Sequence, residues 1–204
     1  MRVEQGTFVG MPTPLYPASP SRLLAWLDCP RRYRMQYLDR PKPEARSQRA
    51  HTSVGIATHN VLRDFWDLPQ SRRTPEGVAE LVRTSWIDVG FRDPEQSASW
   101  RARVTESVVD YLRQVDRHRQ PLGLERAVAL RTDSITVTGR VDRLDDRDGT
   151  VVVVDYKTGR QREAEAHAAQ GARYARAIRD ALGLANEPRF EAWYLAWDEH
   201  GDAG

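Results

Sequence analysis

The sequence predicts an α/β fold, in which a mixed β-sheet is flanked by helices and preceded by an N-terminal helical region. Apolar residues recur with a helical period over residues 19–118, whereas residues 119–204 show strand patterns interrupted by one helix. A chain of 204 residues with 40% apolar side chains is sufficient for one sizeable core. We therefore expect a single domain over residues 19–204. Residues 1–18 contain three prolines, at positions 12, 14 and 17, and no helical period, so we expect a flexible tail there.

Capping signals mark the expected helices. Ser19 followed by Pro20 starts a short helix through Leu27, and Cys29-Pro30 starts another that ends near Leu38. Three further helices are expected. The first covers residues 53–68. The second starts at Thr74-Pro75 and turns Trp86 and Val89 inward, and the third runs from Asp93-Pro94 to about Val115.

The second half of the chain predicts strands near 124–130, 134–142, 150–157 and 189–197, with a helix over 163–182. This order gives an antiparallel meander, a right-handed crossover helix and a last strand that pairs in parallel. Turn residues at 146–149 predict a hairpin centred near Arg147, which would set Asp142 level with residues 152–154.

The strand at 150–157 ends in chemistry that a buried strand does not normally carry. Four consecutive valines, 151–154, predict burial on both faces, yet Asp155 and Lys157 follow. These two residues share a face, while the Tyr156 side chain points away and its carbonyl becomes available. A carboxylate and an ammonium in such a place are costly unless a bound divalent cation organises them. The alternative is a buried structural ion pair between Asp155 and Lys157.

A second carboxylate and an unusual lysine strengthen the metal interpretation. Asp142, on the preceding strand, adds an oxygen ligand suited to Mg²⁺ or Mn²⁺, and such an ion can activate water against a phosphodiester. Of the 31 basic residues, 29 are arginine and only Lys42 and Lys157 are lysine. Position 157 therefore favours a compact ammonium over a guanidinium fork, as a catalytic site beside phosphorus requires.

A basic stretch near the N-terminus is a candidate phosphate-binding patch. It comprises Arg31, Arg32, Arg34, Arg40, Lys42, Arg46 and Arg49. Trp26, Tyr33 and Tyr37 are interleaved with it and are able to stack on unpaired bases of single-stranded nucleic acid. The alternative is a solvated basic helix whose aromatic side chains face the core.

Two helical pairs are further candidates. Gln170 and Tyr174 lie one turn apart with Arg173 beside them, so they either reach DNA or edge a helix–sheet interface. Gly55 and His59 are also one turn apart, and the small glycine leaves space above His59 for a metal or a phosphate. A lone helical histidine is otherwise an ordinary hydrogen-bonded polar group.

Several classes are disfavoured. No apolar run is long enough for a signal peptide or a membrane span. The single cysteine, Cys29, excludes an internal disulfide and an all-cysteine metal site, and it fits a reducing cytoplasm.

Together these motifs resemble the RecB-family nuclease domain of the PD-(D/E)XK superfamily, which includes CRISPR-adaptation nucleases. The resemblance covers residues 19–197. Its motifs are 29–33, Gly55-x-x-x-His59, Glu125, Gly139-x-x-Asp142-Arg143, 155–159 and Gln170-x-x-x-Tyr174.

The resemblance implies a restriction-endonuclease-like sheet and assigns roles to individual residues. His59, Asp142, Asp155 and the Tyr156 carbonyl bind metal, Lys157 positions or activates water, and Glu125 supports the site from the neighbouring strand. Gln170 and Tyr174 touch the DNA. Many relatives hold an iron–sulfur cluster with four cysteines, but Cys29 has no companions here, so no such cluster is expected.

The first functional hypothesis is a Mg²⁺- or Mn²⁺-dependent DNA nuclease, an exonuclease acting on single strands or ends in repair or recombination. The second is a noncatalytic DNA-binding or assembly module of a helicase–nuclease complex, with a helicase as the partner. The third is a stable fold with a structural Asp–Lys pair, which predicts no metal dependence.

Overall fold

The computed structural model describes residues 15–41, 47–158 and 164–195, with the backbone alone for 164–170. The helices are α1 (Pro20–Asp28), α2 (Pro30–Tyr33), the π-helical turn η1 (Arg34–Leu38), α3 (Ala50–Asp67), the 3₁₀ turn η2 (Gln70–Arg72), α4 (Pro75–Ser85), α5 (Pro94–Arg113) and α6 (Ala164–Leu182). The strands are β1 (Tyr16–Ala18), β2 (Gly123–Arg131), β3 (Ile135–Arg147), β4 (Thr150–Lys157) and β5 (Arg189–Tyr194).

The predicted capping residues begin their helices. The side chains of Ser19, Thr74 and Asp93 each accept a hydrogen bond from a backbone N–H in the first turn of α1, α4 and α5. A proline follows each of them, where its missing N–H costs nothing.

One expectation about α4 was wrong. This helix ends at Ser85, so Trp86 and Val89 belong to the connection to α5 rather than to a helical stripe. Trp86 still packs inward, stacked on Phe91 with ring centroids 5.6 Å apart, whereas Val89 is 50% exposed. Apolar spacing alone therefore extended the helix beyond its real end.

The sheet is mixed, as predicted. β2, β3 and β4 form an antiparallel meander, and β5 pairs in parallel with β4 after the crossover through α6. The strand order is β1-β3-β4-β5, and β2 also pairs with β3.

β1 is a departure from the expected tail over residues 1–18. Residues 1–14 lie outside the described part of the chain, but Tyr16–Ala18 pair in parallel with β3, Tyr16 opposite Ile135. The Thr138 hydroxyl donates to the Ala18 carbonyl at 3.3 Å, which fixes this short strand at its end.

The hairpin between β3 and β4 turns later than predicted. Arg147 pairs with Thr150, so the two-residue turn is Asp148–Gly149, and both residues have positive φ (56° and 83°). The ladder runs back to Arg143 opposite Val154. One step beyond this pair, Asp142 comes level with Asp155 rather than with residues 152–154.

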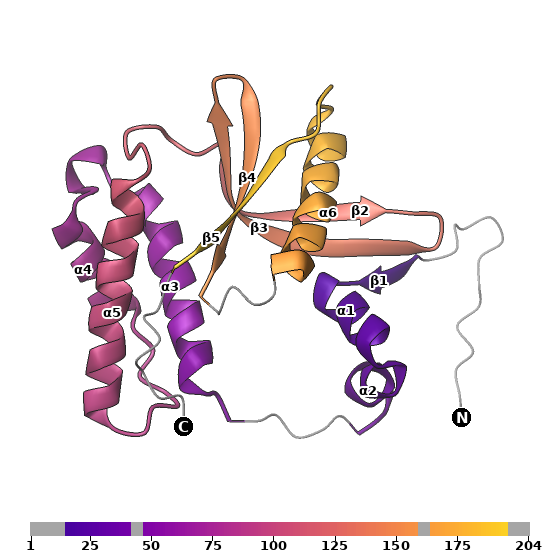
Figure 1. The fold of residues 1–204 in the computed structure, drawn as a ribbon, viewed down its shortest axis with the longest axis horizontal. Helices are drawn as coiled ribbons and strands as arrows, with labels where there is room; N and C mark the ends of the chain where they lie inside the picture. The colour runs from indigo at the N-terminus through magenta and orange to yellow at the C-terminus, as the bar shows by residue number, and fades with distance from the viewer. Residues whose placement is uncertain (1–14, 42–46, 159–163, 196–204) are drawn as a thin grey trace, which may run out of the picture.

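Helices cover both faces of the sheet (Figure 1), and β4 is buried between them. On one side, α3, α4 and α5 pack against Val152, Val154 and Tyr156; on the other, α6 packs against Val153. This alternation confirms the two-sided burial that the four valines predict. Asp155 and Lys157 therefore stand at the end of a strand that both layers hold in place.

The layer formed by α6 lies close to the sheet because two glycines permit it. A Cβ atom on Gly139 of β3 would lie 2.5 Å from Tyr174 Cε1, and one on Gly171 of α6 would lie 2.2 Å from Phe190 Cδ1. Within the described ranges, no helix has both the length and the apolar character needed to cross a bilayer.

Candidate active site

Asp142 stands where the β3–β4 ladder stops. Its Oδ2 accepts a hydrogen bond from the Tyr156 backbone N–H at 2.7 Å, so a carboxylate takes the place of the next rung. The N–H and C=O of one strand residue lie along the same edge, and the Lys157 carbonyl binds Leu195 N beside β5. Alternation therefore puts the Tyr156 carbonyl along the other edge of β4, toward Asp142, as expected of a ligand.

His59 reaches the same carboxylate from α3. Its Nδ1 lies 3.3 Å from Asp142 Oδ1, and its ring meets Tyr156 edge-on at 6.2 Å. Burial alone would lower the pKa of His59, but the hydrogen bond to Asp142 and the negative charges of Asp142, Asp155 and Glu125 outweigh it and raise the pKa. The surroundings of this imidazole thus favour positive charge, as a cation site requires.

Glu125 completes a compact group with His59 and Asp142. One ligand atom from each of the three residues lies within 4.8 Å of the other two. In the β2–β3 ladder, Leu124 pairs with Arg143 and Arg126 with Val141, so Glu125 lies opposite Asp142. Its φ is +48°, a left-handed conformation that is uncommon for a side-chain-bearing residue inside a strand.

Arg140, two residues before Asp142 on β3, contacts this group. Its Nη1 lies 3.1 Å from Glu125 Oε2, and the arginine itself is exposed. Glu125 was expected to support the site from the neighbouring strand, but its carboxylate lies among the candidate ligands. Arg140 was not anticipated as a residue that orients it.

Asp155 and Lys157 form the second half of the site. Lys157 Nζ lies 2.5 Å from Asp155 Oδ2, and the carboxylate is buried. Burial raises the pKa of Asp155 and the nearby charge of Asp142 raises it further, against the opposing effects of Lys157 and His59. Among the described residues, Asp155 is outside the compact group of three. It lies next to that group and holds the ammonium in place.

These donors fit a divalent cation. A neutral imidazole nitrogen and carboxylate oxygens from β2, β3 and β4 are ligands that Mg²⁺ and Mn²⁺ accept. Two carboxylates beside one lysine, Asp155 buried and Asp142 half-buried, leave local negative charge that such a cation would offset. Gly55 was expected to leave space above His59 for a metal or a phosphate. A Cβ on Gly55 would lie 3.3 Å from Thr158 Oγ1, so the space that this glycine leaves is used by Thr158.

The expected DNA contacts on α6 are placed less favourably. Tyr174 is only 7% exposed and packs over Gly139 in the cluster that α6 forms with the sheet. Its ring therefore belongs to the helix–sheet interface, the alternative that spacing left open. Arg173 is half-buried, and the side chain of Gln170 lies outside the described residues.

The N-terminal basic stretch is exposed at Arg31, Arg32 and Arg34, whereas Lys42 and Arg46 lie outside the described residues. Arg32 pairs with Asp28 at 2.7 Å and Arg34 with Asp39 at 3.1 Å.

The aromatic residues of this stretch divide between the two interpretations. Tyr33 is buried and stands between Trp26 and Tyr37, with ring centroids 5.5 and 5.1 Å away. Trp26 is 50% exposed and remains available for contact with a base.

Arg143 belongs to the Gly139-x-x-Asp142-Arg143 motif, but its burial was not predicted. Although it follows Asp142 and looks like a surface arginine, it is 2% exposed, with its guanidinium carbon 4.7 Å from the Trp66 ring centroid and Nη2 2.7 Å from Asp145 Oδ2. Strand alternation was the available signal, because Arg143 shares the period of Val141, which is buried.

A family model described as the PD-(D/E)XK nuclease superfamily matches residues 17–203. The chain belongs to the PD-(D/E)XK nuclease superfamily. The match spans every helix and all but the first residue of the strands described above, and it agrees with the restriction-endonuclease-like sheet that the sequence predicts. No curated protein sequence matches the chain. Membership in the PD-(D/E)XK superfamily suggests metal-dependent nuclease chemistry, and the described residues include one group that could hold a metal ion, His59, Glu125 and Asp142.

Proposed function

We propose that this protein is a metal-dependent nuclease that hydrolyses phosphodiester bonds in DNA. The observation that carries the proposal is the convergence of His59, Glu125 and Asp142 within 4.8 Å, beside the Asp155–Lys157 pair at the end of β4. A purely structural ion pair between Asp155 and Lys157 would not need the other three residues to gather beside it.

We assign the metal to His59, Glu125 and Asp142, with Asp155 and the Tyr156 carbonyl completing the set. Mg²⁺ and Mn²⁺ are the ions that such oxygen-rich ligands suit. When bound, the ion supplies Lewis acidity toward the phosphate and lowers the pKa of a coordinated water.

Lys157 provides the remaining charge. Asp155 holds its ammonium at 2.5 Å, at the end of a strand that is buried from both sides. A compact ammonium in that position can orient a water and stabilise negative charge that develops on the phosphoryl oxygens. The carboxylate thus limits the rotation of Lys157 and keeps it directed at one place.

The finer features of the function are also proposals. We propose a RecB-like exonuclease that acts on single strands or ends in repair or recombination, with a helicase as the partner. The exposed arginines of α2 and η1 and the half-exposed Trp26 favour contact with a flexible, single-stranded backbone. We further propose that residues 19–204 act as one domain in a reducing cytoplasm, in keeping with the single Cys29.

A noncatalytic DNA-binding module is the second candidate. The exposed arginines at positions 31, 32 and 34 favour it as well, because phosphate contacts alone bring affinity without cleavage. It differs in one prediction, since binding by such a module does not depend on Asp155 or Lys157.

The test is cleavage of end-labelled single- and double-stranded DNA with Mg²⁺, Mn²⁺ or EDTA. We expect cutting with metal only, reduced at least 100-fold in Asp155→Asn and Lys157→Met, because a positioned catalytic group contributes about 10²–10⁴. Asp148→Asn is the matched control: it makes the same chemical change at the hairpin tip, where the side chain is 88% exposed and asparagine tolerates positive φ. DNA binding without cutting under either metal would favour the noncatalytic module.

A further inference from the structure

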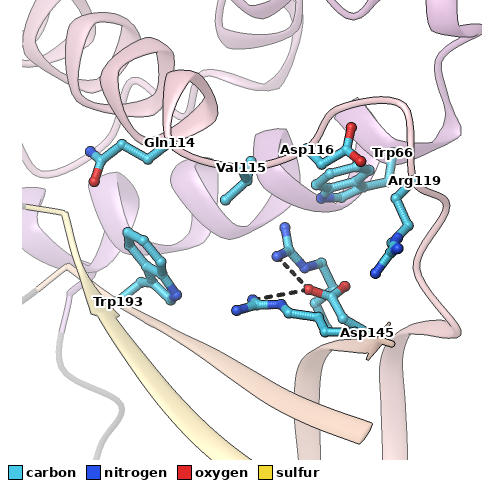
Figure 2. Close-up of a pocket in the computed structure, with 9 residues that line it drawn as sticks. Trp66, Gln114, Val115, Asp116, Arg119, Asp145 and Trp193 are labelled. Atoms are coloured by element: carbon cyan, nitrogen blue, oxygen red, sulfur yellow. Dashed lines mark hydrogen bonds and ion pairs between the residues drawn. The ribbon is translucent and has the colours of Figure 1, made fainter. Parts of the chain in front are cut away.

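A pocket of about 360 Å³ lies between the helical layer and the ends of β3 and β5, next to the candidate metal site and distinct from it. Figure 2 shows Trp66 and Trp193 on different sides of this space, with Asp145 below them. Trp66 and His59 are both on α3, seven residues or two turns apart, which corresponds to about 10 Å along the helix. A volume of this size is in the range of small-molecule sites.

The wall of the pocket contains a buried arginine, Arg143, whose guanidinium keeps hydrogen-bond donors that no described residue pairs. Arg143 lines the pocket and is 2% exposed; its Nη2 binds Asp145, but within the described residues Nε and Nη1 have no hydrogen-bond partner. A buried charged donor without acceptors is costly, and it is rarely retained for packing alone. Its unpaired atoms are all donors, so the complementary group is an acceptor.

Arg143 is the arginine of the pocket that keeps donors without a partner in the described part of the chain. Arg119, Arg143 and Arg147 all line the pocket. Arg147 pairs with Glu191 at 3.0 Å as well as with Asp145, and Arg119 pairs with Asp148 at 3.1 Å. Among the described residues, Arg143 pairs only with Asp145, which it shares with Arg147, so an incoming anion would be bound chiefly by Arg143.

The indole walls restrict the ligand further. Trp193 is half-buried and offers a flat apolar surface, whereas Trp66 is 2% exposed and holds Arg143 over its ring at 4.7 Å. A planar heterocycle attached to a phosphate would use both features, the ring against indole and the phosphate oxygens against Arg143.

We propose that this pocket binds a nucleoside monophosphate, with its phosphate at Arg143 and its base against Trp193. The choice of a nucleotide rests on the proposed nuclease function, whereas the affinity for phosphate rests on the pocket alone. The pocket would then be a second nucleotide site, outside the metal-binding group.

The experiment is isothermal titration of the intact chain in EDTA with dAMP, inorganic phosphate and deoxyadenosine, at a constant ionic strength set with chloride. We expect saturable binding of dAMP, weaker binding of phosphate and weaker binding still of deoxyadenosine. Arg143→Lys and Arg143→Met should lower the affinity for dAMP at least 10-fold. The control Arg83→Met removes an exposed arginine from α4 and should leave it unchanged. Asp155→Asn should also retain binding, because the pocket does not use the metal ligands.

Three results would overturn the proposal: no saturable binding of dAMP or phosphate by the wild-type chain at millimolar concentration, equal affinity in folded Arg143 variants, or loss of binding in Asp155→Asn. If both Arg143 variants fail to fold, Trp193→Phe decides, since it should reduce the affinity for dAMP while leaving that for phosphate unchanged. Binding of phosphate by a chain that cuts no DNA would refute the nuclease and keep the pocket.

Discussion

Replacing Gly139 with alanine should loosen the packing of α6 on the sheet. The new Cβ would lie 2.5 Å from Tyr174 Cε1, 2.9 Å from its hydroxyl and 3.1 Å from Cζ, whereas ordinary contacts begin at 3.4 Å. The Tyr174 ring must therefore retreat by nearly 1 Å. Since it is buried in the cluster of α6 and the sheet, this retreat separates the two layers or forces a strained rotamer.

The magnitude follows from the overlap. Overpacking of a buried site costs about 1–3 kcal/mol, and the full loss of a buried aromatic ring sets an upper limit of about 3–5 kcal/mol. Relief of the glycine's extra chain entropy returns about 0.5–1 kcal/mol. An overlap of nearly 1 Å belongs at the upper end of the overpacking range, so we expect a net destabilisation of about 2 kcal/mol, which lowers a urea midpoint by about 1 M for a slope near 2 kcal/mol/M.

A double-mutant cycle with Tyr174→Leu isolates the cause. Leucine removes the ring atoms that the new methyl would meet, so Gly139→Ala should cost at least 1 kcal/mol less in the Tyr174→Leu background than in the wild type. Urea unfolding followed by far-UV circular dichroism gives all four free energies. Additive effects in this cycle, or a Gly139→Ala midpoint equal to that of the wild type, would refute the steric reasoning.

Three other predictions concern the site, a cap and the core. Mn²⁺ should stabilise the folded wild type, by about 2.7 kcal/mol when its concentration is 100 times its Kd, and should therefore raise the melting temperature. Asp155→Asn should abolish this rise. Equal rises in the two proteins would show that Asp155 does not bind the metal. Thr74→Ala should cost about 1 kcal/mol because it removes the cap of α4, whereas Thr84→Ala in the same helix should be neutral or slightly stabilising, as urea midpoints will show. Tyr111→Phe should cost about 1–2 kcal/mol, because it removes the 3.2 Å partner of the buried Tyr156 hydroxyl; unchanged stability would mean that this hydroxyl finds another partner.

Local signals in the sequence were enough for most of the fold. Ser19, Thr74 and Asp93 act within one turn of the chain, and a capping side chain followed by proline needs no tertiary context to begin a helix. The strand predicted over 150–157 has the same bounds as β4. A run of valines that begins after a turn and ends in charged residues can be recognised without knowledge of its tertiary contacts.

Elements that depend on partners were harder to predict. β1 has only three residues, one of them a proline, and it exists because β3 offers a free edge beside it. The hairpin register was misjudged because the predicted turn included Asp146 and Arg147, while the ladder continues through both.

Within the site, the chemistry was easier to anticipate than the packing. Asp142, Asp155 and Lys157 stand out because charged groups are conspicuous against valine. Alternation along β3 indicates that Arg143 is buried, but its contact with Trp66 joins residues that are distant in sequence, and so does the contact of Tyr174 with Gly139.

The hydrogen bond from Tyr156 N to Asp142 has a consequence for how this site can be dissected. Asp142 is both a candidate ligand and the last residue that links β3 to β4. Replacing it would therefore change the metal site and the strand pairing at the same time. A substitution there would let the strand ends separate, and lost activity would say little about which role had failed. Replacing Asp155 is the cleaner experiment, because β4 remains hydrogen-bonded to β5 along its other edge. Over evolutionary time the same double duty would make position 142 slow to change, even in a descendant that had abandoned catalysis.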